Sequence, residues 1–188
     1  MLTFIFDDNR KKLLKSMPKG SVCAEIGVWK GEFSKRILDV TKPSKLHLID
    51  PWAFQPDFPC RWYGGTRARS QEEMDMVFEG VRERFSGCIE VKFHRDYSDK
   101  AASEFPDEYF DWIYIDGNHD YEFVKKDLEA FLPKVKDDGF LTGDDYLLPS
   151  PDNSKFLPVK EAVSEFVRGN SVELLKLFGA QFIIRKTG

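Results

Sequence analysis

Short apolar runs alternate with amphipathic segments along most of the chain. The apolar runs predict strands at Val22–Ile26, Lys45–Ile49, Ile89–Phe93, Asp111–Ile115, Phe140–Thr142, Val172–Phe178 and Gln181–Arg185. Apolar residues at helical spacing predict helices at Phe33–Val40, Gln71–Phe85, Tyr121–Leu132 and Val159–Val167. Strands that alternate with helices are typical of right-handed βαβ units, so the pattern predicts one α/β domain built on a mostly parallel sheet.

The end of the chain departs from this alternation. Only Gly179 and Ala180 separate the last two predicted strands. Parallel neighbours need a crossover of about a dozen residues or more, so these two strands must be antiparallel. We therefore expect a mostly parallel sheet that finishes in an antiparallel hairpin.

Two segments fall outside the repeating pattern. Residues 1–19 form an N-terminal arm with a short apolar run, Leu2–Phe6, followed by charged residues. Residues 51–87 form an insertion that is too long for an ordinary connection between a strand and a helix. Its first part, Pro51–Arg69, is rich in Pro, Gly, Arg and aromatic residues. That composition suits a lid or substrate loop, and it suits a surface elaboration without a chemical role equally well.

Charge and cysteine content narrow the function classes. The formal net charge of −4 argues mildly against nucleic acid as a partner, because nucleic-acid-binding proteins usually present a basic face. Arg61, Arg67 and Arg69 are the one local basic candidate. The cysteines are widely spaced without a CxxC pair, which favours reduced thiols. No signal peptide is evident, and no stretch reaches the roughly 20 apolar residues of a membrane span, so we expect a cytoplasmic protein.

A glycine-punctuated turn, ExGxxxG, follows the first predicted strand and is made by Glu25, Gly27 and Gly31. Glycines let a ligand approach the backbone beside a helix N-terminus. The spacing differs from the GxGxxG fingerprint of dinucleotide sites, and a glutamate there would repel a pyrophosphate. The turn suits a ligand without phosphate and with a positive end, such as S-adenosylmethionine with its sulfonium and amino groups. The alternative is an ordinary turn with a capping acid.

Polar residues also follow the second and third predicted strands. Asp50 lies about 20 residues after the glycine turn, where an open α/β sheet places its ribose-binding acid. An aspartate that simply ends the strand before Pro51 is the alternative. Asp96 and Ser98 follow the third strand, in a position to meet the adenine end of a nucleoside. Either of these two residues is equally suited to cap the next helix.

Carboxylates follow the fourth and fifth predicted strands, with Asp116 after one and Asp144 and Asp145 after the other. Neighbouring strands lie about 4.8 Å apart, so acids at their carboxyl ends can reach one ion. Three carboxylates suit Mg²⁺, Mn²⁺ or Ca²⁺. His119, three residues after Asp116, suits a general base on a substrate hydroxyl. Turn-forming aspartates and a structural histidine are the alternatives.

Three segments, Ala24–Gly31, Leu46–Trp52 and above all Asp111–Tyr146, carry a family resemblance. They resemble the class I S-adenosylmethionine-dependent methyltransferases, and among these the branch of the macrocin-type sugar O-methyltransferases. The resemblance covers residues 20–50 and 88–186 and leaves out the arm and the insertion. It implies a Rossmann-like α/β sandwich with a seven-stranded, mostly parallel sheet whose last strand is antiparallel.

The resemblance also implies roles for individual residues. Cofactor binding falls to Glu25, Gly27, Gly31, Asp50, Asp96, Ser98 and Asp116. Metal binding falls to Asp116, Asp144 and Asp145, and catalysis to His119 and Asp116. The third strand lacks the glycine that often ends it in this family, so the adenine assignment of Asp96 and Ser98 is the weakest of these matches.

These observations predict O-methylation of a small-molecule hydroxyl, sugar-like or natural-product-like, with S-adenosylmethionine as donor and Mg²⁺ or another divalent cation assisting. Relatives are often dimers or larger, so a homo-oligomer is a further option. The alternatives are a methyltransferase acting on nucleic acid or protein, a non-catalytic binding module, and an NAD-dependent oxidoreductase. The absent GxGxxG disfavours the last, and Asp116-Gly117-Asn118-His119 differs from the Asn/Asp-Pro-Pro-aromatic motif of nucleic-acid N-methylation.

Overall fold

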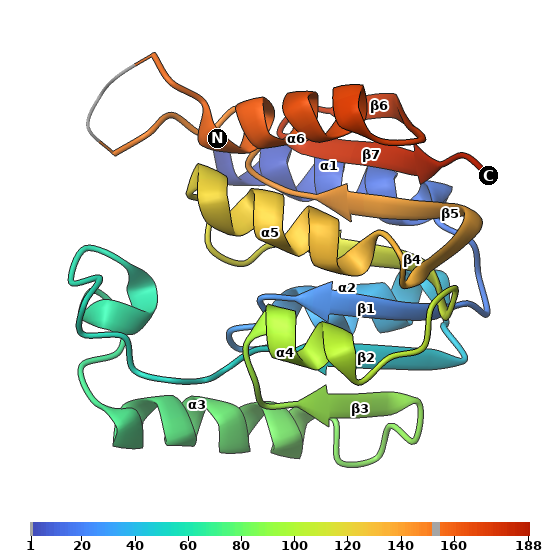
Figure 1. The fold of residues 1–188 in the computed structure, drawn as a ribbon. Helices are drawn as coiled ribbons and strands as arrows, with labels where there is room; N and C mark the ends of the chain where they lie inside the picture. Colours follow the sequence, from blue (N-terminus) through green and yellow to red (C-terminus); the bar gives the residue numbers. More distant parts are fainter. Residues whose placement is uncertain (1, 152–154) are drawn as a thin grey trace.

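The computed structural model describes residues 2–151 and 155–188, which fold around one mixed sheet (Figure 1). Its strands are β1 (Val22–Ile26), β2 (Lys45–Ile49), β3 (Val91–His94), β4 (Phe110–Ile115), β5 (Val135–Gly143), β6 (Val172–Phe178) and β7 (Gln181–Lys186). They lie in the order β3-β2-β1-β4-β5-β7-β6. Strands β1 to β5 are parallel, and β7 runs antiparallel between β5 and β6. The predicted seven-stranded sheet with an antiparallel last strand is confirmed.

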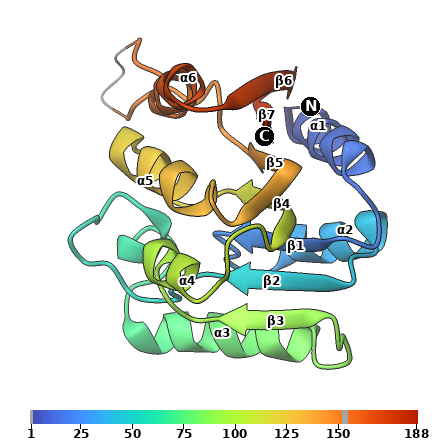
Figure 2. The same cartoon turned by 45° about the vertical axis from the view of Figure 1, so that its right-hand side comes forward.

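Helices cover both faces of the sheet (Figure 2). Those of the described residues are α1 (Leu2–Ser16), α2 (Glu32–Thr41), α3 (Gln71–Arg84), α4 (Ser98–Ser103), α5 (Tyr121–Phe131) and α6 (Pro158–Gly169). Buried residues of α1, α2 and α3 share one apolar cluster, and those of α4, α5 and α6 share the other. The molecule is therefore a three-layer sandwich, as expected for a doubly covered α/β sheet.

Strand β4 shows how one apolar run serves both layers. Trp112 and Tyr114 are fully buried in the cluster with α1, α2 and α3. Ile113 and Ile115 point to the opposite face and are buried in the cluster with α4, α5 and α6. Because successive side chains of a strand alternate between faces, an uninterrupted apolar run marks a strand covered on both sides.

Three predicted boundaries need correction. The arm, for which no element was predicted, begins with helix α1, whose Leu13 and Leu14 are buried against the sheet. The charged residues that precede them obscure the helical period in the sequence. Strand β3 begins at Val91 because Ile89 is 86% exposed in the preceding turn. Strand β5 begins at Val135, five residues earlier than predicted, through a polar stretch that pairs irregularly with β4.

Register places the ends of four strands at one edge. Ile26 pairs with Ile49 of β2 and with Ile115 of β4, and Ile115 pairs in turn with Gly143 of β5. The residues that follow these strand ends are Gly27, Asp50, Asp116 and Asp144. In an open α/β sheet the carboxyl edge of the strands is where ligands bind, so the register brings the predicted site residues to the functional edge.

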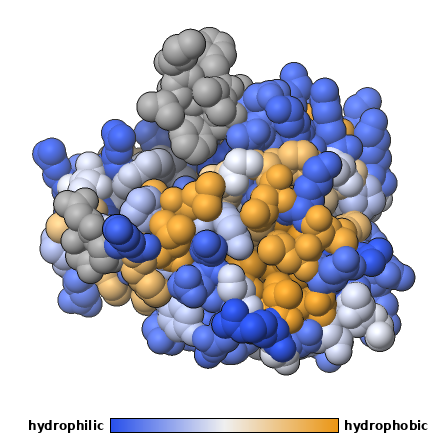
Figure 3. Space-filling model, turned by 90° about the horizontal axis from the view of Figure 1, so that it is seen from above, coloured by the Kyte–Doolittle hydropathy of each residue, from blue (hydrophilic) through white to orange (hydrophobic). Residues whose placement is uncertain are grey.

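The lateral edge of the sheet that lies farthest from β3 is formed by an apolar strand. Strand β6 is the last of the sheet, and its Leu175 and Leu177 are 41% and 43% exposed. Viewed from above, apolar side chains gather on this part of the surface (Figure 3).

No helix among the described residues is long and apolar enough to cross a membrane. The predicted homo-oligomer stays a prediction.

Candidate functional site

A cavity of about 1020 Å³ opens at the carboxyl edge of the strands. Its walls come from the turns after β1, β2, β3, β4 and β5, from α1 and α5, and from the first part of the insertion. Of the predicted site residues, the lining includes Glu25, Gly27, Asp50, Ser98, Asp116, His119 and Asp145. The structure thus brings residues from five separate turns to one hollow.

The glycine turn lies at the centre of this edge. Gly27 has φ of 85°, and a Cβ on it would lie 2.2 Å from the carbonyl oxygen of Asp116. Only glycine fits there, because the backbones after β1 and β4 are in direct contact. Glu25 is 1% exposed and accepts a hydrogen bond from the Ser34 hydroxyl. Burial raises the pKa of Glu25 well above its usual range, against the lowering effect of that hydrogen bond.

Asp50 joins the glycine turn to the insertion. Its Oδ2 accepts hydrogen bonds from the backbone N–H of Val28 at 2.9 Å and of Trp29 at 3.0 Å, and from the Tyr63 hydroxyl at 2.5 Å. Its Oδ1 accepts from the backbone N–H of Trp52 at 2.7 Å. Burial raises the pKa of Asp50 although these donors lower it. The predicted ribose acid is therefore held in place by neutral donors from two segments.

The two residues predicted at the adenine end separate in the structure. Ser98 lines the cavity, and its hydroxyl donates to Oδ1 of Asp127 at 2.5 Å. Asp96 is not among the described residues that line the cavity. Its Oδ1 accepts from the backbone N–H of Tyr97 at 2.8 Å and lies 3.6 Å from Nζ of Lys100. Neither residue is the N-cap of α4, a position that Tyr97 occupies.

Asp127 is a lining residue that the sequence analysis missed. It lies on α5, is 5% exposed, and contacts the cavity beside Ser98. The signal was present, because Asp127 falls among the apolar positions Val124, Leu128 and Phe131 that bury α5. An acid on the apolar face of a helix rarely stays buried without a reason in the site or the packing.

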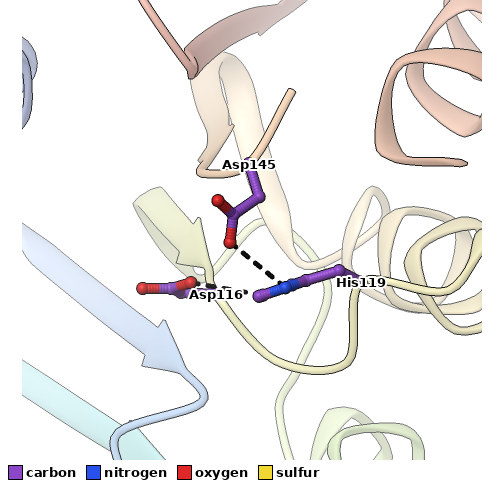
Figure 4. A group of neighbouring side chains, drawn as sticks. All are labelled: Asp116, His119 and Asp145. Carbon is purple, nitrogen blue, oxygen red and sulfur yellow. Dashed lines mark ion pairs between the residues drawn. The ribbon is translucent and has the colours of Figure 1, made fainter. Parts of the chain in front are cut away.

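Asp116, His119 and Asp145 form a compact group at the ends of β4 and β5 (Figure 4). Nδ1 of His119 lies 3.1 Å from Oδ2 of Asp145, and Nε2 lies 3.4 Å from Oδ1 of Asp116. Within the described part of the chain, Nε2 is buried without a hydrogen-bond partner. A buried nitrogen of this kind is suited to bind a ligand, a metal ion or a proton that the resting protein lacks.

The surroundings raise the pKa of all three members of this group. Burial lowers the pKa of His119, but the neighbouring carboxylates of Asp116, Asp145 and Asp144 outweigh it, so the pKa is raised overall. Burial raises the pKa of Asp145 to about 6, against the lowering effect of His119. Burial also raises the pKa of Asp116. Each of the three groups therefore binds a proton more tightly than it does in water, and shifted pKa values of this kind are typical of functional sites.

Asp144 faces away from this group and toward the N-terminal helix. Its Oδ2 accepts a hydrogen bond from Nε of Arg10 at 2.7 Å, and its Oδ1 accepts one from the Gln181 amide. Nη2 of Arg10 also reaches Asp144 and lies 3.0 Å from Oδ2 of Asp116. Helix α1 therefore delivers a guanidinium to the acids predicted to bind metal, a contact that spans 134 positions of sequence.

The donor set can be tested against a divalent ion. One atom from each of Asp116, His119 and Asp145 lies within 4.8 Å of the others, which is close enough for one ion to be shared. Two carboxylates and an imidazole suit Mn²⁺ and similar ions, and the unpartnered Nε2 fits such a role. The sequence predicted Asp144 as a third acidic ligand, but in the structure it lies outside this group because its Oδ2 accepts a hydrogen bond from Arg10.

The insertion folds over the cavity. The ring of Trp29 lies 5.6 Å from that of Trp62 and 5.3 Å from that of Tyr63. Arg61 forms an ion pair with Asp120 at the start of α5, and the guanidinium of Arg67 lies 5.5 Å from the Trp62 ring. Two of the three arginines of this segment therefore make contacts within the chain, and the aromatic rings form part of the cavity wall.

Comparisons with known proteins identify relatives of this arrangement. Residues 24–146 match the family described as "Methyltransferase domain". The structure is similar to that of the O-methyltransferase NovP, with TM-score 0.64 and 22% identity over 96% of this chain and 80% of NovP. A Streptococcus mutans protein provisionally named a methyltransferase, solved in complex with S-adenosylhomocysteine (SAH), gives TM-score 0.61 and 12% identity over 96% of this chain and 97% of that one.

A third similar structure comes from Staphylococcus aureus and is provisionally named a caffeoyl-CoA O-methyltransferase. It gives TM-score 0.61 and 14% identity over 99% of this chain and 83% of that chain. No curated protein matches the sequence. At these identities the structural likeness establishes the fold, which agrees with the match of residues 24–146.

Proposed function

Because this chain belongs to the family of methyltransferase domains, we propose that it transfers a methyl group from S-adenosylmethionine to a hydroxyl oxygen of a small molecule, sugar-like or natural-product-like. The observation that carries this proposal is the group Asp116, His119 and Asp145 beside the glycine turn. It puts a histidine, oriented by a carboxylate, at the edge of a cavity large enough for two ligands.

The donor side of the cavity fits a cationic ligand. Glu25, Asp50 and Asp127 are each at most 5% exposed and line the hollow. Among the described residues none of the three forms an ion pair, since their partners are hydroxyl and backbone donors. Buried carboxylates without a countercharge attract a ligand that brings one, as the sulfonium and ammonium groups of S-adenosylmethionine do. We assign Gly27 to a close backbone contact with the donor and Asp50 to its ribose. Gly31 lies outside the cavity lining, where a side chain would collide with the Phe85 ring.

His119 is assigned to proton transfer. Asp145 holds its Nδ1, which leaves Nε2 to take the proton of a substrate hydroxyl. When bound, S-adenosylmethionine supplies a methyl carbon activated by the positive sulfur. The substrate oxygen forms a bond to that carbon, the carbon–sulfur bond breaks with its electron pair left on sulfur, and neutral SAH results. The residues of the cavity accelerate this step chiefly by holding the two reactants in line.

A divalent ion would be held by the carboxylates of Asp116 and Asp145, which leaves Nε2 of His119 for the proton of the substrate hydroxyl. A bound ion would lower the pKa of a coordinated hydroxyl, which is the chemistry that this group adds to the site. Asp144 would join the ligands after release from Arg10, whose guanidinium now contacts both Asp144 and Asp116. We propose that the metal assists the reaction and is not its base, because His119 and the carboxylate of Asp145 that orients it are present in the chain itself.

The first experiment is calorimetric titration with S-adenosylmethionine and SAH, with and without Mg²⁺ or Mn²⁺, and with NAD as the control ligand. Micromolar binding of the two sulfur ligands and no binding of NAD supports the donor. Methyl transfer is then measured as SAH release with phenols, catechols and sugars as acceptors, in buffer with EDTA or with metal. Turnover only on RNA or protein would move the proposal to that substrate class. Donor binding without turnover on any class would favour a non-catalytic module.

A further inference from the structure

The mouth of the cavity carries two cationic side chains that form no ion pair with any described residue. Lys30 lies in the glycine turn and Arg67 in the insertion, and both are exposed and line the cavity. Each approaches a tryptophan ring. Nζ of Lys30 lies 5.5 Å from the centre of the Trp29 ring, and Cζ of Arg67 lies 5.5 Å from that of Trp62. Both charges are therefore available to a ligand.

The other two arginines of the lining are neutralised within the chain. Arg10 is paired with the acids that follow β4 and β5, and Arg61 is paired with Asp120. Glu32 and Asp57 also line the cavity, but neither lies within ion-pair distance of any described lysine or arginine. Only the two cations beside the tryptophans thus keep an uncompensated positive charge among the described residues of the cavity wall.

The two tryptophans form an aromatic platform between these cations. Their ring centres lie 5.6 Å apart at an interplanar angle of 57°. Trp29 has φ of 54°, a conformation that residues other than glycine rarely adopt, and its carbonyl oxygen accepts a hydrogen bond from Nε1 of Trp52 at 2.9 Å. Trp62 is 52% exposed although it is large and apolar. Its ring offers a face against which the ring of a ligand can pack.

The insertion connects this platform with the reacting end of the cavity. Arg61 contacts Asp120, the residue that directly follows the proposed base His119, and Trp62 is the next residue after Arg61. Trp62 in turn packs on Trp29 of the glycine turn. An acceptor whose hydroxyl lies at His119 can therefore extend along the insertion toward the two cations.

We propose that the methyl acceptor carries an anionic group, a carboxylate or a phosphate, on the part of the molecule away from the reacting hydroxyl. Arg67 is the specificity-determining residue that binds this anion, Lys30 adds a second positive charge, and Trp62 packs against the adjoining ring. The inference rests on the proposed function, because it names a class of acceptor for the same site. A guanidinium suits either anion, since it can donate two parallel hydrogen bonds.

Two alternatives make different predictions. S-adenosylmethionine itself carries a carboxylate, and a cation that binds it would affect the affinity for SAH in the absence of any acceptor. A cation that only solvates the surface would affect neither donor nor acceptor. The preference for a charged over a neutral acceptor, measured with the donor site filled, is therefore the decisive quantity.

The test is calorimetry on protein saturated with SAH. Two pairs of probes differ in charge at one position: caffeate with caffeyl alcohol, and 4-nitrophenyl β-glucuronide with 4-nitrophenyl β-glucoside. The 6-phosphate of that glucoside distinguishes a phosphate from a carboxylate. In at least one pair we expect the anionic member to bind about 10-fold more tightly, the effect of a hydrogen bond between charged groups. High salt should reduce this preference, because the cations are exposed.

Substitutions assign the preference to residues. Arg67→Ala should lower it by about 10-fold and leave the affinity for SAH unchanged, whereas Arg67→Lys should keep part of it. Trp62→Ala should weaken the charged and the neutral member alike, so that their ratio stays the same. Arg69→Ala is the matched control and should retain the wild-type preference, because Arg69 is an exposed cation of the same segment that lies outside the cavity lining.

Several outcomes would overturn the inference. Equal affinity for charged and neutral probes in both pairs, or no binding of any anionic probe, would show that the acceptor site does not select an anion. A preference retained in folded Arg67→Ala would remove Arg67 from the site. A loss of SAH affinity in that variant without a change in the preference would assign Arg67 to the donor. If the wild-type protein does not bind SAH, the proposed function fails and this inference fails with it.

Discussion

The two halves of the cavity satisfy their buried acids in different ways. On the side of β1, β2 and β3, the side-chain donors to Glu25, Asp50 and Asp127 are neutral hydroxyls, from Ser34, Tyr63 and Ser98 respectively. On the side of β4 and β5, Asp116, Asp144 and Asp145 are paired with the cationic or protonatable side chains of Arg10 and His119, and Asp144 also accepts a hydrogen bond from the Gln181 amide.

This difference separates two electrostatic tasks. Hydroxyl donors satisfy a carboxyl group without supplying a countercharge, so the first half contains acids that a cationic ligand would stabilise in their ionised form. Ion pairs compensate charge within the second half, which is then able to move a proton without a large change in field. Within the proposed function, the charge of the partner groups would separate the acids that bind the donor from the acids that take part in proton transfer.

The largest effect is expected when the proposed base, His119, is removed from the side of β4 and β5. His119→Ala should lower the rate of methyl transfer by about 10²- to 10⁴-fold, the usual contribution of a general base. Affinity for SAH should stay near its wild-type value, because His119 contacts the acids of β4 and β5. The measurements are SAH release with an acceptor found in the screen and calorimetry with SAH. A variant with wild-type turnover would remove His119 from the reaction.

The pH dependence of stability tests the protonation of the buried acids on the side of β1, β2 and β3. Asp127 has a folded-state pKa of about 6, raised from 3.8. A raised acid pKa means that the folded state binds the proton more tightly, so the folded protein loses stability as pH rises through this window. Asp127→Asn cannot ionise. Its free energy of unfolding, relative to wild type, should therefore rise by up to about 3 kcal/mol between pH 4 and pH 7.

Urea unfolding at several pH values measures this difference. The absolute stabilities of both proteins will change with pH for other reasons, which the subtraction removes. Asp99→Asn, which removes an exposed acid of the neighbouring helix α4, serves as the control and should give a far smaller change. If the difference in free energy of unfolding between Asp127→Asn and wild type does not change with pH, Asp127 ionises in the folded protein as it does in the unfolded chain.

The smallest effect is expected when Arg10, the cationic side chain on the side of β4 and β5, is replaced. In Arg10→Ala, the acids Asp144 and Asp116 lose the guanidinium that contacts both. We expect Mn²⁺ to bind about 10-fold more tightly than to wild type, because a positive charge no longer opposes the ion at short range. Titration followed by electron paramagnetic resonance of free Mn²⁺ measures the affinity.

Arg10→Lys is the matched variant, since it keeps the charge but loses the planar fork that reaches two carboxylates. It should bind Mn²⁺ nearly as weakly as the wild type. Equal Mn²⁺ affinities in all three proteins would show that Arg10 and the ion do not compete for the acids.

Much of the fold and half of the site could be predicted from sequence because the relevant signals are local. Asp50 and Asp116 directly follow buried strands, so their place at the functional edge follows from the apolar runs before them. Strand β5 was harder, because its first half contains Asp137, Asp138 and Gly139, which are typical of turns.

The remaining part of the site depends on contacts that no local pattern records. Arg10 reaches partners that lie 106 and 134 positions away in sequence, and it comes from an arm whose helical period is masked by charges. Asp127 is a single acid within an amphipathic helix, and its exposure depends on how α4 packs on α5. Both assignments require the tertiary structure, because the partner decides the role.

The contact between the turn after β1 and the turn after β4 also bears on how such a protein can change. No methyl group fits between Gly27 and the carbonyl oxygen of Asp116, so any side chain at position 27 would force the turn after β4 away from the turn after β1. Within the proposed function, substrate choice would therefore be altered most easily in the insertion and the N-terminal helix, which also line the cavity.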